Sequence, residues 1–270
     1  LAFRRYPGTP DLGLAILVHG SSGSAAEMHQ AAKAFARSGI TAIAIDVRGH
    51  GASGPRGDIF HAGQLDEDLT DLVRYLTKSY PGEPRILIGH SSGGGYVLHV
   101  AASRLACAFR GYLALSPFLN YRAPTIRPGN GGWASVYLPR IIALSILRRF
   151  RIPQFEGLPV IAFATTPGAD AAQTKTYSFR LLMDFGLDAD WQSAIRRISQ
   201  PTRVIVGSKD ELFYSDGFAP IFKLLQPQIS VTLLDGVDHM GIVLDTAALG
   251  AQVPIAKALL ADNTIAQCTP

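Results

Sequence analysis

The chain has 270 residues, of which 47% are hydrophobic and 17% are charged. This apolar content is ample for a large core, and the length fits one large α/β domain with an insertion or two small domains. A disulfide-stabilised miniprotein and a disordered chain are therefore excluded. The net charge of +4 comes without the runs of like charge that a nucleic-acid-binding surface needs, so we expect no nucleic-acid partner.

The two cysteines, Cys107 and Cys268, have neither the spacing of zinc ligands nor that of a disulfide framework, and they leave the redox compartment open. No run of apolar residues approaches the roughly 18 needed to cross a bilayer, so the sequence as given is expected to be soluble. A signal peptide or anchor would lie upstream of Leu1, and the compartment and the oligomeric state are not predicted.

Six short apolar runs bounded by turn signals predict the strands of a buried sheet. They cover residues 14–18, 41–45, 85–88, 112–115, 203–206 and 231–234. Their apolar residues are nearly continuous, which is typical of parallel strands covered on both faces. Helical periodicity appears between them, at residues 25–37 and 65–80. This alternation predicts an α/β fold with a mostly parallel, doubly wound sheet.

The alternation stops between residue 116 and about residue 200, a stretch too long for a simple loop. We interpret residues 117–200 as an inserted cap or lid, and residues 1–116 with 201–270 as the core domain. The first part of this cap, residues 121–155, has no Asp or Glu. It contains six arginines, which are Arg122, Arg127, Arg140, Arg148, Arg149 and Arg151.

The segment Gly89-His90-Ser91-Ser92-Gly93 follows an apolar strand and precedes a helical pattern, which is the context of a nucleophile elbow. The backbone of the serine is strained in such a turn, and Gly89 and Gly93 lack the side chains that would collide with it. Ser91 is therefore predicted to project from the carboxyl edge of the sheet as the nucleophile. The alternative is a Gly/Ser-rich turn without a catalytic role.

A nucleophilic serine needs a base and a carboxylate that orients the base. Predicted strand 203–206 leads into Asp210, and predicted strand 231–234 leads into His239. Because parallel strands end at the same edge of a sheet, we expect Ser91, Asp210 and His239 to converge as a catalytic triad. The alternative for His239 is a surface loop. Four other acidic residues compete with Asp210, namely Glu211, Asp216, Asp235 and Asp238.

The loop after strand 14–18 contains two glycines and can fold toward the elbow. We expect the backbone N–H groups of Ser21 and Ser92 to form the oxyanion hole, with no part for their side chains. Residues 21–24 can also be interpreted as a polar turn that caps a helix beginning at Ala25, and both interpretations can hold together.

Other residues near these motifs predict neither a metal nor a cofactor. The histidines lack H-x-x-x-H or H-E-x-x-H spacing, which disfavours a zinc site. The glycines of segment 49–54 lack the Gly-Lys-Ser/Thr ending of a phosphate-binding loop. Three histidines beside the motifs are interpreted as residues that hold loops by hydrogen bonds, namely His19, His50 and His90.

Segments 19–20, 46–54, 89–94, 207–211 and 238–239 occur in an order that resembles the α/β-hydrolase superfamily. Within it, they resemble the branch of lysophospholipases and monoacylglycerol lipases. The resemblance covers nearly the whole chain outside residues 117–200. It implies a triad of Ser91, Asp210 and His239 with oxyanion donors at Ser21 and Ser92. The commoner elbow of that branch has Met in place of Ser92, a departure that concerns pocket shape rather than mechanism.

These features together predict a cofactor-free serine esterase that cleaves lipid-like or other apolar acyl esters through an acyl-enzyme. One alternative is a non-catalytic binding or interaction module on a hydrolase fold. Another is a serine hydrolase acting on a thioester or an amide. An aminopeptidase would be expected to offer carboxylates to a substrate amine, and residues 121–155 offer only arginines. Apolar and basic residues at 133–150 predict a lid with weak contact to a membrane surface, or simple packing onto the core.

Overall fold

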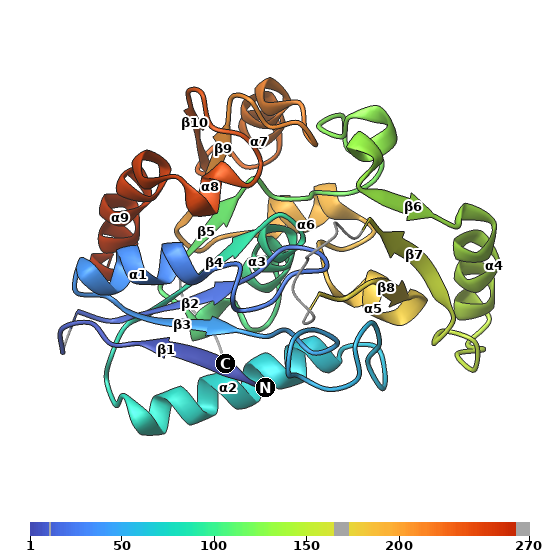
Figure 1. The fold of residues 1–270 in the computed structure, drawn as a ribbon, viewed down its shortest axis with the longest axis horizontal. Helices are drawn as coiled ribbons and strands as arrows, with labels where there is room; N and C mark the ends of the chain where they lie inside the picture. The colour runs from blue at the N-terminus through green and yellow to red at the C-terminus, as the bar shows by residue number, and fades with distance from the viewer. Residues whose placement is uncertain (11, 165–172, 263–270) are drawn as a thin grey trace.

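The computed structural model describes residues 1–10, 12–164 and 173–262. Its main sheet has seven strands in the order β1-β3-β2-β4-β5-β9-β10 (Figure 1). The parallel strands are β2 (Leu14–Val18), β3 (Thr41–Ile45), β4 (Arg85–His90), β5 (Gly111–Leu115), β9 (Thr202–Gly207) and β10 (Ser230–Leu234). β1 (Phe3–Tyr6) pairs antiparallel with β3 at one edge. The predicted mostly parallel sheet is confirmed, with β1 as an additional strand.

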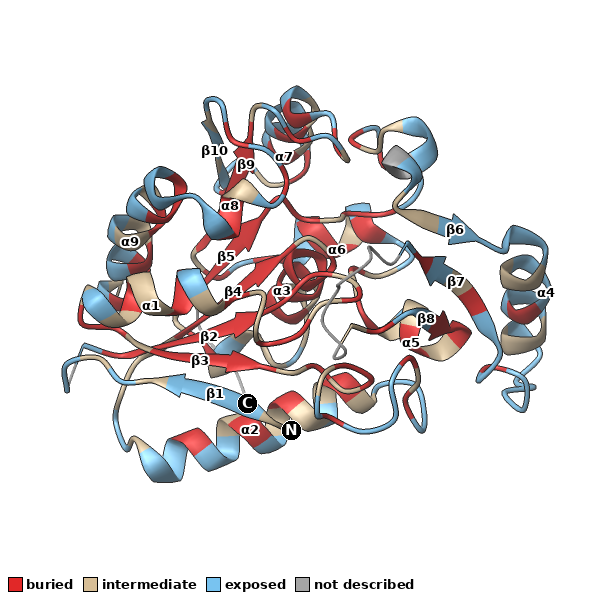
Figure 2. Ribbon diagram, viewed as in Figure 1, coloured by how far each residue is buried: buried red, intermediate tan, exposed pale blue. Residues whose placement is uncertain are grey.

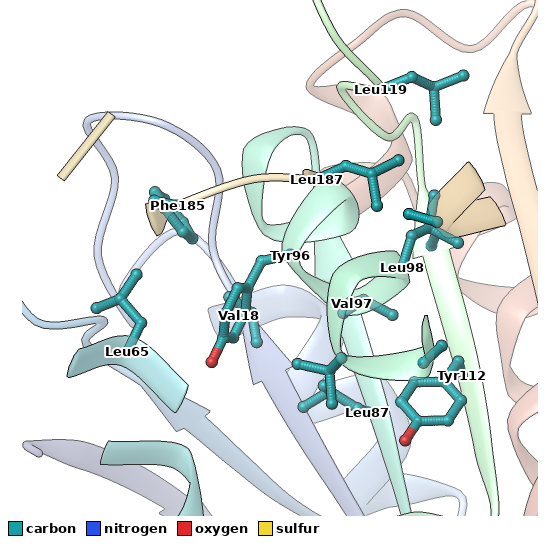
Figure 3. Close-up of a cluster of buried hydrophobic side chains, with 14 of the residues drawn as sticks. Val18, Leu65, Leu87, Tyr96, Val97, Leu98, Tyr112, Leu119, Phe185 and Leu187 are labelled. Carbon is teal, nitrogen blue, oxygen red and sulfur yellow. The ribbon is translucent and has the colours of Figure 1, made fainter. Parts of the chain in front are cut away.

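Helices cover both faces of the sheet. One face packs against α1 (His29–Arg37), α8 (Gly241–Leu244) and α9 (Thr246–Ala261). The other packs against α2 (Gln64–Ser79), α3 (Ser92–Ala102), α6 (Trp191–Arg197) and α7 (Phe218–Leu225). Figure 3 shows part of this second layer, where Tyr96 and Val97 of α3 lie near Leu87 of β4. The predicted helix 25–37 begins only at His29, because residues 25–28 form turns.

The two helical layers explain why the strands are apolar throughout. Ala15 and Leu17 of β2 face one layer, and Ile16 and Val18 face the other, because successive side chains of a strand point to opposite faces. All five residues of β2 are buried, and the central strands are red in Figure 2. A strand that is buried on both faces does not alternate polar with apolar residues.

A second, smaller sheet lies beside the main one (Figure 1). It contains β6 (Ala134–Val136), β7 (Pro159–Phe163) and β8 (Thr176–Ser178), which pair antiparallel with β7 in the middle. α4 (Leu138–Arg149) joins β6 to β7, and α5 (Phe179–Asp184) follows β8. α6 packs instead on α3 and α7 of the main layer. Residues 117–200 thus contribute both to the small sheet and to the helical layer of the main sheet. The predicted cap boundaries stay a prediction.

Short 3₁₀ turns lie at Ala106–Ala108, Pro128–Gly132 and Ser215–Gly217. Cys107, in the first of them, takes part in a disulfide bond, although the cysteine spacing predicted no disulfide framework. Cys268 lies outside the described residues. Within the described ranges, no helix is both long enough and apolar enough to cross a membrane.

Candidate active site

Ser91 occupies the turn between β4 and α3. Its backbone has φ 54° and ψ −117°, a strained conformation that residues other than glycine rarely adopt. Its N–H donates to the carbonyl of Leu115 in β5 (2.9 Å). A Cβ on Gly89 would overlap the carbonyl oxygen of Gly93, and one on Gly93 would overlap that of His19. The turn therefore requires glycine at both positions, as expected of a nucleophile elbow.

His239 and Asp210 form a buried hydrogen-bonded pair. Nδ1 of His239 lies 2.8 Å from Oδ2 of Asp210, and Oδ1 of Asp210 accepts from the N–H groups of Leu212 (3.0 Å) and Phe213 (2.9 Å). Burial raises the pKa of Asp210, but the hydrogen bond and charge of His239, together with further hydrogen bonds such as that from the Leu212 N–H, hold this pKa below its ordinary value. A carboxylate can only accept, so Nδ1 is the donor, and Nε2 of the neutral ring can take a proton.

Three of the four competing acids have other partners. Glu211 accepts from the backbone N–H of His239 (3.0 Å). Asp235 accepts from the Ser208 hydroxyl (3.0 Å), and Asp238 accepts from the N–H of Gly241 (2.6 Å). Among the described residues, only Asp210 is hydrogen-bonded to the His239 ring.

The predicted oxyanion donors lie on adjoining segments. The hydroxyl oxygens of Ser21 and Ser92 are 2.5 Å apart, a contact that the sequence did not predict. Neither backbone N–H donates to another residue in the described part of the chain. For Ser92 this follows from its place at the start of α3, because the first N–H groups of a helix have no partner within it. Both N–H groups are therefore free to stabilise an oxyanion.

A cavity of about 630 Å³ gathers most of these residues. Ser21, Ser91 and His239 line it, together with apolar side chains that include Trp133 and Met240. Ser92 and Asp210 are buried and do not appear among its described lining residues. The hydroxyl of Ser91, the imidazole of His239 and the loop that carries the N–H of Ser21 therefore line one largely apolar cavity.

Two carboxylates, Glu27 and Glu211, also line the cavity, and its described lining contains no Lys or Arg. Oε1 of Glu27 accepts from the N–H of Gly20 (2.9 Å) and lies 3.0 Å from Nδ1 of His90. Burial raises the pKa of Glu27, but the hydrogen bond and charge of His90 outweigh it and lower this pKa. Neither carboxylate is predicted from the sequence to line the substrate site, because only residues 121–155 are expected to offer charged groups to a substrate. The position of Glu211 beside Asp210 was the available signal.

The interpretation of His19, His50 and His90 as hydrogen-bonding residues agrees with their contacts. Nδ1 of His19 lies 2.7 Å from the Gly20 carbonyl, and its Nε2 accepts from the N–H of Val47 (3.1 Å). Nε2 of His90 lies 3.0 Å from the carbonyl of His239. Burial lowers the pKa of His19 and holds that of His50 well below its usual value. The rings of His19 and His50 are therefore neutral, and all three histidines support the surrounding loops through hydrogen bonds.

An arginine of the predicted cap supports the loop of the acid. Nε of Arg127 donates to the carbonyls of Asp210 (3.2 Å) and Phe213 (3.0 Å). Its guanidinium also lies 4.5 Å from the ring centre of Tyr214. The described residues include no group of three or more His, Cys, Asp or Glu side chains that could hold a metal ion.

A strained serine between a parallel strand and a helix, with a His–Asp pair after later strands, defines the α/β-hydrolase class. The chain belongs to the family described as "Serine aminopeptidase, S33", whose model matches residues 10–245. The predicted α/β-hydrolase fold and superfamily are confirmed, and the resemblance to monoacylglycerol lipases agrees with relatives of that name.

Individual relatives illustrate the breadth of this group. A monoacylglycerol lipase of Mycolicibacterium smegmatis is 37% identical over 97 residues, which cover 36% of this chain and only 35% of that protein. The 2-(acetamidomethylene)succinate hydrolase of Mesorhizobium japonicum is 24% identical over 74% of this chain and 72% of its own length. The crystal structure of the Paleococcus ferrophilus monoacylglycerol lipase has a TM-score of 0.70 at 21% identity, covering 96% of this chain and 99% of that one.

Proposed function

We propose that this chain is a serine hydrolase that cleaves uncharged carboxylic esters with apolar acyl groups through an acyl-enzyme. One observation carries the proposal: Ser91 and His239 line the same cavity, and the His239 ring is bonded to Asp210. The apolar part of the cavity wall, which includes Trp133, Leu212 and Met240, suits an acyl chain.

The proposed reaction uses groups of the chain alone. Nε2 of His239 takes the proton of Ser91 as its Oγ attacks the ester carbonyl, and the N–H groups of Ser21 and Ser92 stabilise the oxyanion. His239 then gives the proton to the leaving alcohol. A water molecule, deprotonated by the same imidazole, attacks the acyl-enzyme and releases the acid. Asp210 fixes the tautomer and stabilises the imidazolium in both steps.

The charge of the cavity favours neutral substrates. Glu27 and Glu211 both line it, and the described lining offers no positive side chain to a substrate carboxylate. A dicarboxylate, such as the name of the Mesorhizobium japonicum relative implies, would meet two like charges in a partly desolvated site. We therefore expect neutral acyl esters to react faster than esters of dicarboxylic acids.

A panel of substrates tests the proposal. Wild type and Ser91→Ala are compared on neutral p-nitrophenyl esters, monoacylglycerols, a hemisuccinate ester and a thioester, with labelling by a fluorophosphonate probe. We expect labelling and turnover of neutral esters by wild type only. A protein that binds these esters without turnover or labelling would be the non-catalytic module. Preference for the hemisuccinate or the thioester would reject the proposed substrate class.

The two carboxylates also favour a second candidate, a substrate with an amine near the scissile bond. The family description names aminopeptidases, and Glu27 and Glu211 could bind an ammonium group. Aminoacyl p-nitroanilides distinguish this candidate. If they react faster than neutral esters, and if Glu27→Gln removes that preference, the amine-bearing substrate is the correct one.

We further propose that the small sheet and α4 form a lid whose outer face contacts an anionic membrane surface. α4 exposes Leu138 (54%), Ile142 (52%) and Ile146 (53%), and residues 121–155 have six arginines and no acid. An apolar face beside the exposed side chains of Arg149 and Arg151 suits a lipid surface.

A further inference from the structure

Ser22 follows the proposed donor Ser21, and its backbone is held in an unusual conformation. It is fully buried, with φ 65°, a left-handed value that persists in a non-glycine residue only when the surroundings impose it. Its N–H donates to the hydroxyl of Tyr177 (2.7 Å), and its own hydroxyl donates to the carbonyl of Thr174 (2.6 Å). Its carbonyl accepts from the N–H of Thr174 (3.0 Å). All three polar groups of Ser22 thus bond to β8 and the residues before it.

The direction of the Tyr177 hydroxyl follows from its partners. Because its oxygen accepts from Ser22, its proton is free for Nε2 of His50, which lies 2.5 Å away. Nε2 must then be unprotonated, and Nδ1 carries the ring proton toward the carbonyl of Arg48 (3.3 Å). Burial holds the pKa of His50 well below its ordinary value, so the ring stays neutral and keeps this arrangement. The pair is enclosed, with Tyr177 1% and His50 0% exposed.

The N–H of Ser21 is anchored from both sides. The carbonyl of Gly20, in the same peptide unit, lies 2.7 Å from Nδ1 of His19, which fixes the plane of that unit. Ser22, on the other side, is held from β8. The value of an oxyanion donor depends on its position, and a displacement of about 1 Å can cost on the order of 100-fold in rate.

We propose that Tyr177 is a positioning residue of the oxyanion hole: its hydroxyl, supported by His50, holds Ser22 so that the N–H of Ser21 faces the substrate carbonyl oxygen. This inference rests on the proposed serine hydrolase function. It makes the small sheet a support of the reaction centre, because a shift of β8 would break the bonds of all three polar groups of Ser22 together.

Tyr177→Phe tests the inference, and Tyr112→Phe is the matched control. Tyr112 is equally buried (0% exposed), and its hydroxyl donates to the carbonyl of Ala106 (2.7 Å), outside the cavity lining. On a neutral p-nitrophenyl ester, we expect Tyr177→Phe to lower kcat about 10- to 100-fold and to change KM by less than about twofold. Affinity for a trifluoromethyl ketone, which forms a tetrahedral oxyanion, should fall by the same factor as kcat/KM. Tyr112→Phe should change none of these values.

Hydrogen exchange of a peptide covering residues 19–28 gives a readout independent of turnover, and it should quicken in Tyr177→Phe only. An unchanged kcat in Tyr177→Phe, or an equal loss in Tyr112→Phe, overturns the inference while Ser91-dependent turnover in wild type upholds the proposed function. Wild type without Ser91-dependent turnover refutes both. Should Tyr177→Phe fail to fold, Ser22→Gly removes the hydroxyl bond to Thr174 without backbone strain. We expect several-fold lower kcat with unchanged KM, and wild-type kcat would overturn the inference.

Discussion

The loops at the carboxyl edge of the main sheet and the outer face of α4 use their residues in opposite ways. In the loops, polar side chains are buried and paired: His19, His50 and Ser22 are each 0% exposed and hydrogen-bonded. On α4 and the residues after it, large apolar side chains are exposed, and Phe150 reaches 71%. Figure 2 shows the same contrast, with red loops beside the sheet and a largely pale-blue α4.

The two regions have different physical requirements. A reaction centre requires fixed atoms, and buried hydrogen bonds supply that rigidity. α4 buries Leu144 against Val160 and Phe179, yet it is also apolar on its outer side, at Leu138 and Ile142. When one apolar side of a helix packs on the protein and the other is exposed, the exposed side is available for an interaction. Substitutions in the loops are therefore expected to lower the rate of hydrolysis, and substitutions on α4 are expected to weaken binding to a surface.

The largest expected effect is at the nucleophile. Ser91→Ala should abolish probe labelling and lower kcat about 10⁶-fold, and His239→Ala should do nearly the same, because the two act as a unit. Burst kinetics with a p-nitrophenyl ester measures both. A normal acylation burst in Ser91→Ala would assign the nucleophile elsewhere.

Next comes the acid. Asp210→Asn should lower kcat on the order of 10⁴-fold, because an amide at this position no longer selects the Nδ1-protonated tautomer. Glu211→Gln is the matched control, since glutamine keeps an acceptor for the N–H of His239, which Glu211 bonds at 3.0 Å. Steady-state kinetics of both variants decides the matter. A larger loss of kcat in Glu211→Gln than in Asp210→Asn would indicate that Glu211, and not Asp210, orients His239.

The strand ends of the first region can be located from the sequence for a physical reason. Buried parallel strands are apolar throughout, so the residues where they end, such as Ser91, Asp210 and His239, stand out. The edge strand β1 was missed because its residues Arg4 and Arg5 are exposed and give no apolar pattern. β6 and β8 have three residues each, too few for a period.

Contacts that depend on tertiary folding left no local signal. Ser22 and Tyr177 are 155 positions apart, and no motif predicts that pairing. Arg148 is one of the six arginines of residues 121–155, and the sequence predicts no partner for it. It lies 3.5 Å from buried Glu156 and 5.8 Å from the ring centre of Phe179.

For α4, the expected effect is on vesicle binding. Arg149→Glu with Arg151→Glu should weaken co-sedimentation with anionic vesicles by at least roughly 30-fold, because each lost positive charge is worth about 1 kcal/mol near such a surface. Both side chains are exposed and form no ion pair with a described residue. Hydrolysis of a short soluble ester should not change.

Arg4→Glu with Arg37→Glu is the control for that experiment. It reverses two exposed charges on β1 and α1, on the side of the molecule away from α4 (Figure 1). If both double variants bind vesicles equally well, the charge of α4 has no special role. If wild type itself does not bind, the membrane contact is wrong and α4 is a lid without that function.

The smallest effect is expected outside both regions, at His99 of α3. Nδ1 of His99 lies 2.6 Å from Asp188, which follows α5, and its Nε2 lies 3.1 Å from Asp66 of α2. Burial lowers the pKa of His99, but the hydrogen bonds and charges of the two aspartates outweigh burial and raise it to about 10. The imidazolium is thus part of an ion-pair cluster that links α3 to α2 and to the segment after α5.

A raised pKa sets the sign of the pH dependence. The stabilisation is fully present below the unfolded-state pKa of about 6.5, and it is lost as pH rises through the folded-state value of about 10. The free energy of unfolding should therefore fall between these pH values, and His99→Gln should flatten that fall without changing kcat. Urea unfolding at several pH values measures the slope. The control is His61→Gln, at an exposed histidine 3.4 Å from Glu67, and it should keep the wild-type slope. Equal slopes in His99→Gln and wild type would show that the contacts of His99 with Asp66 and Asp188 do not stabilise the fold.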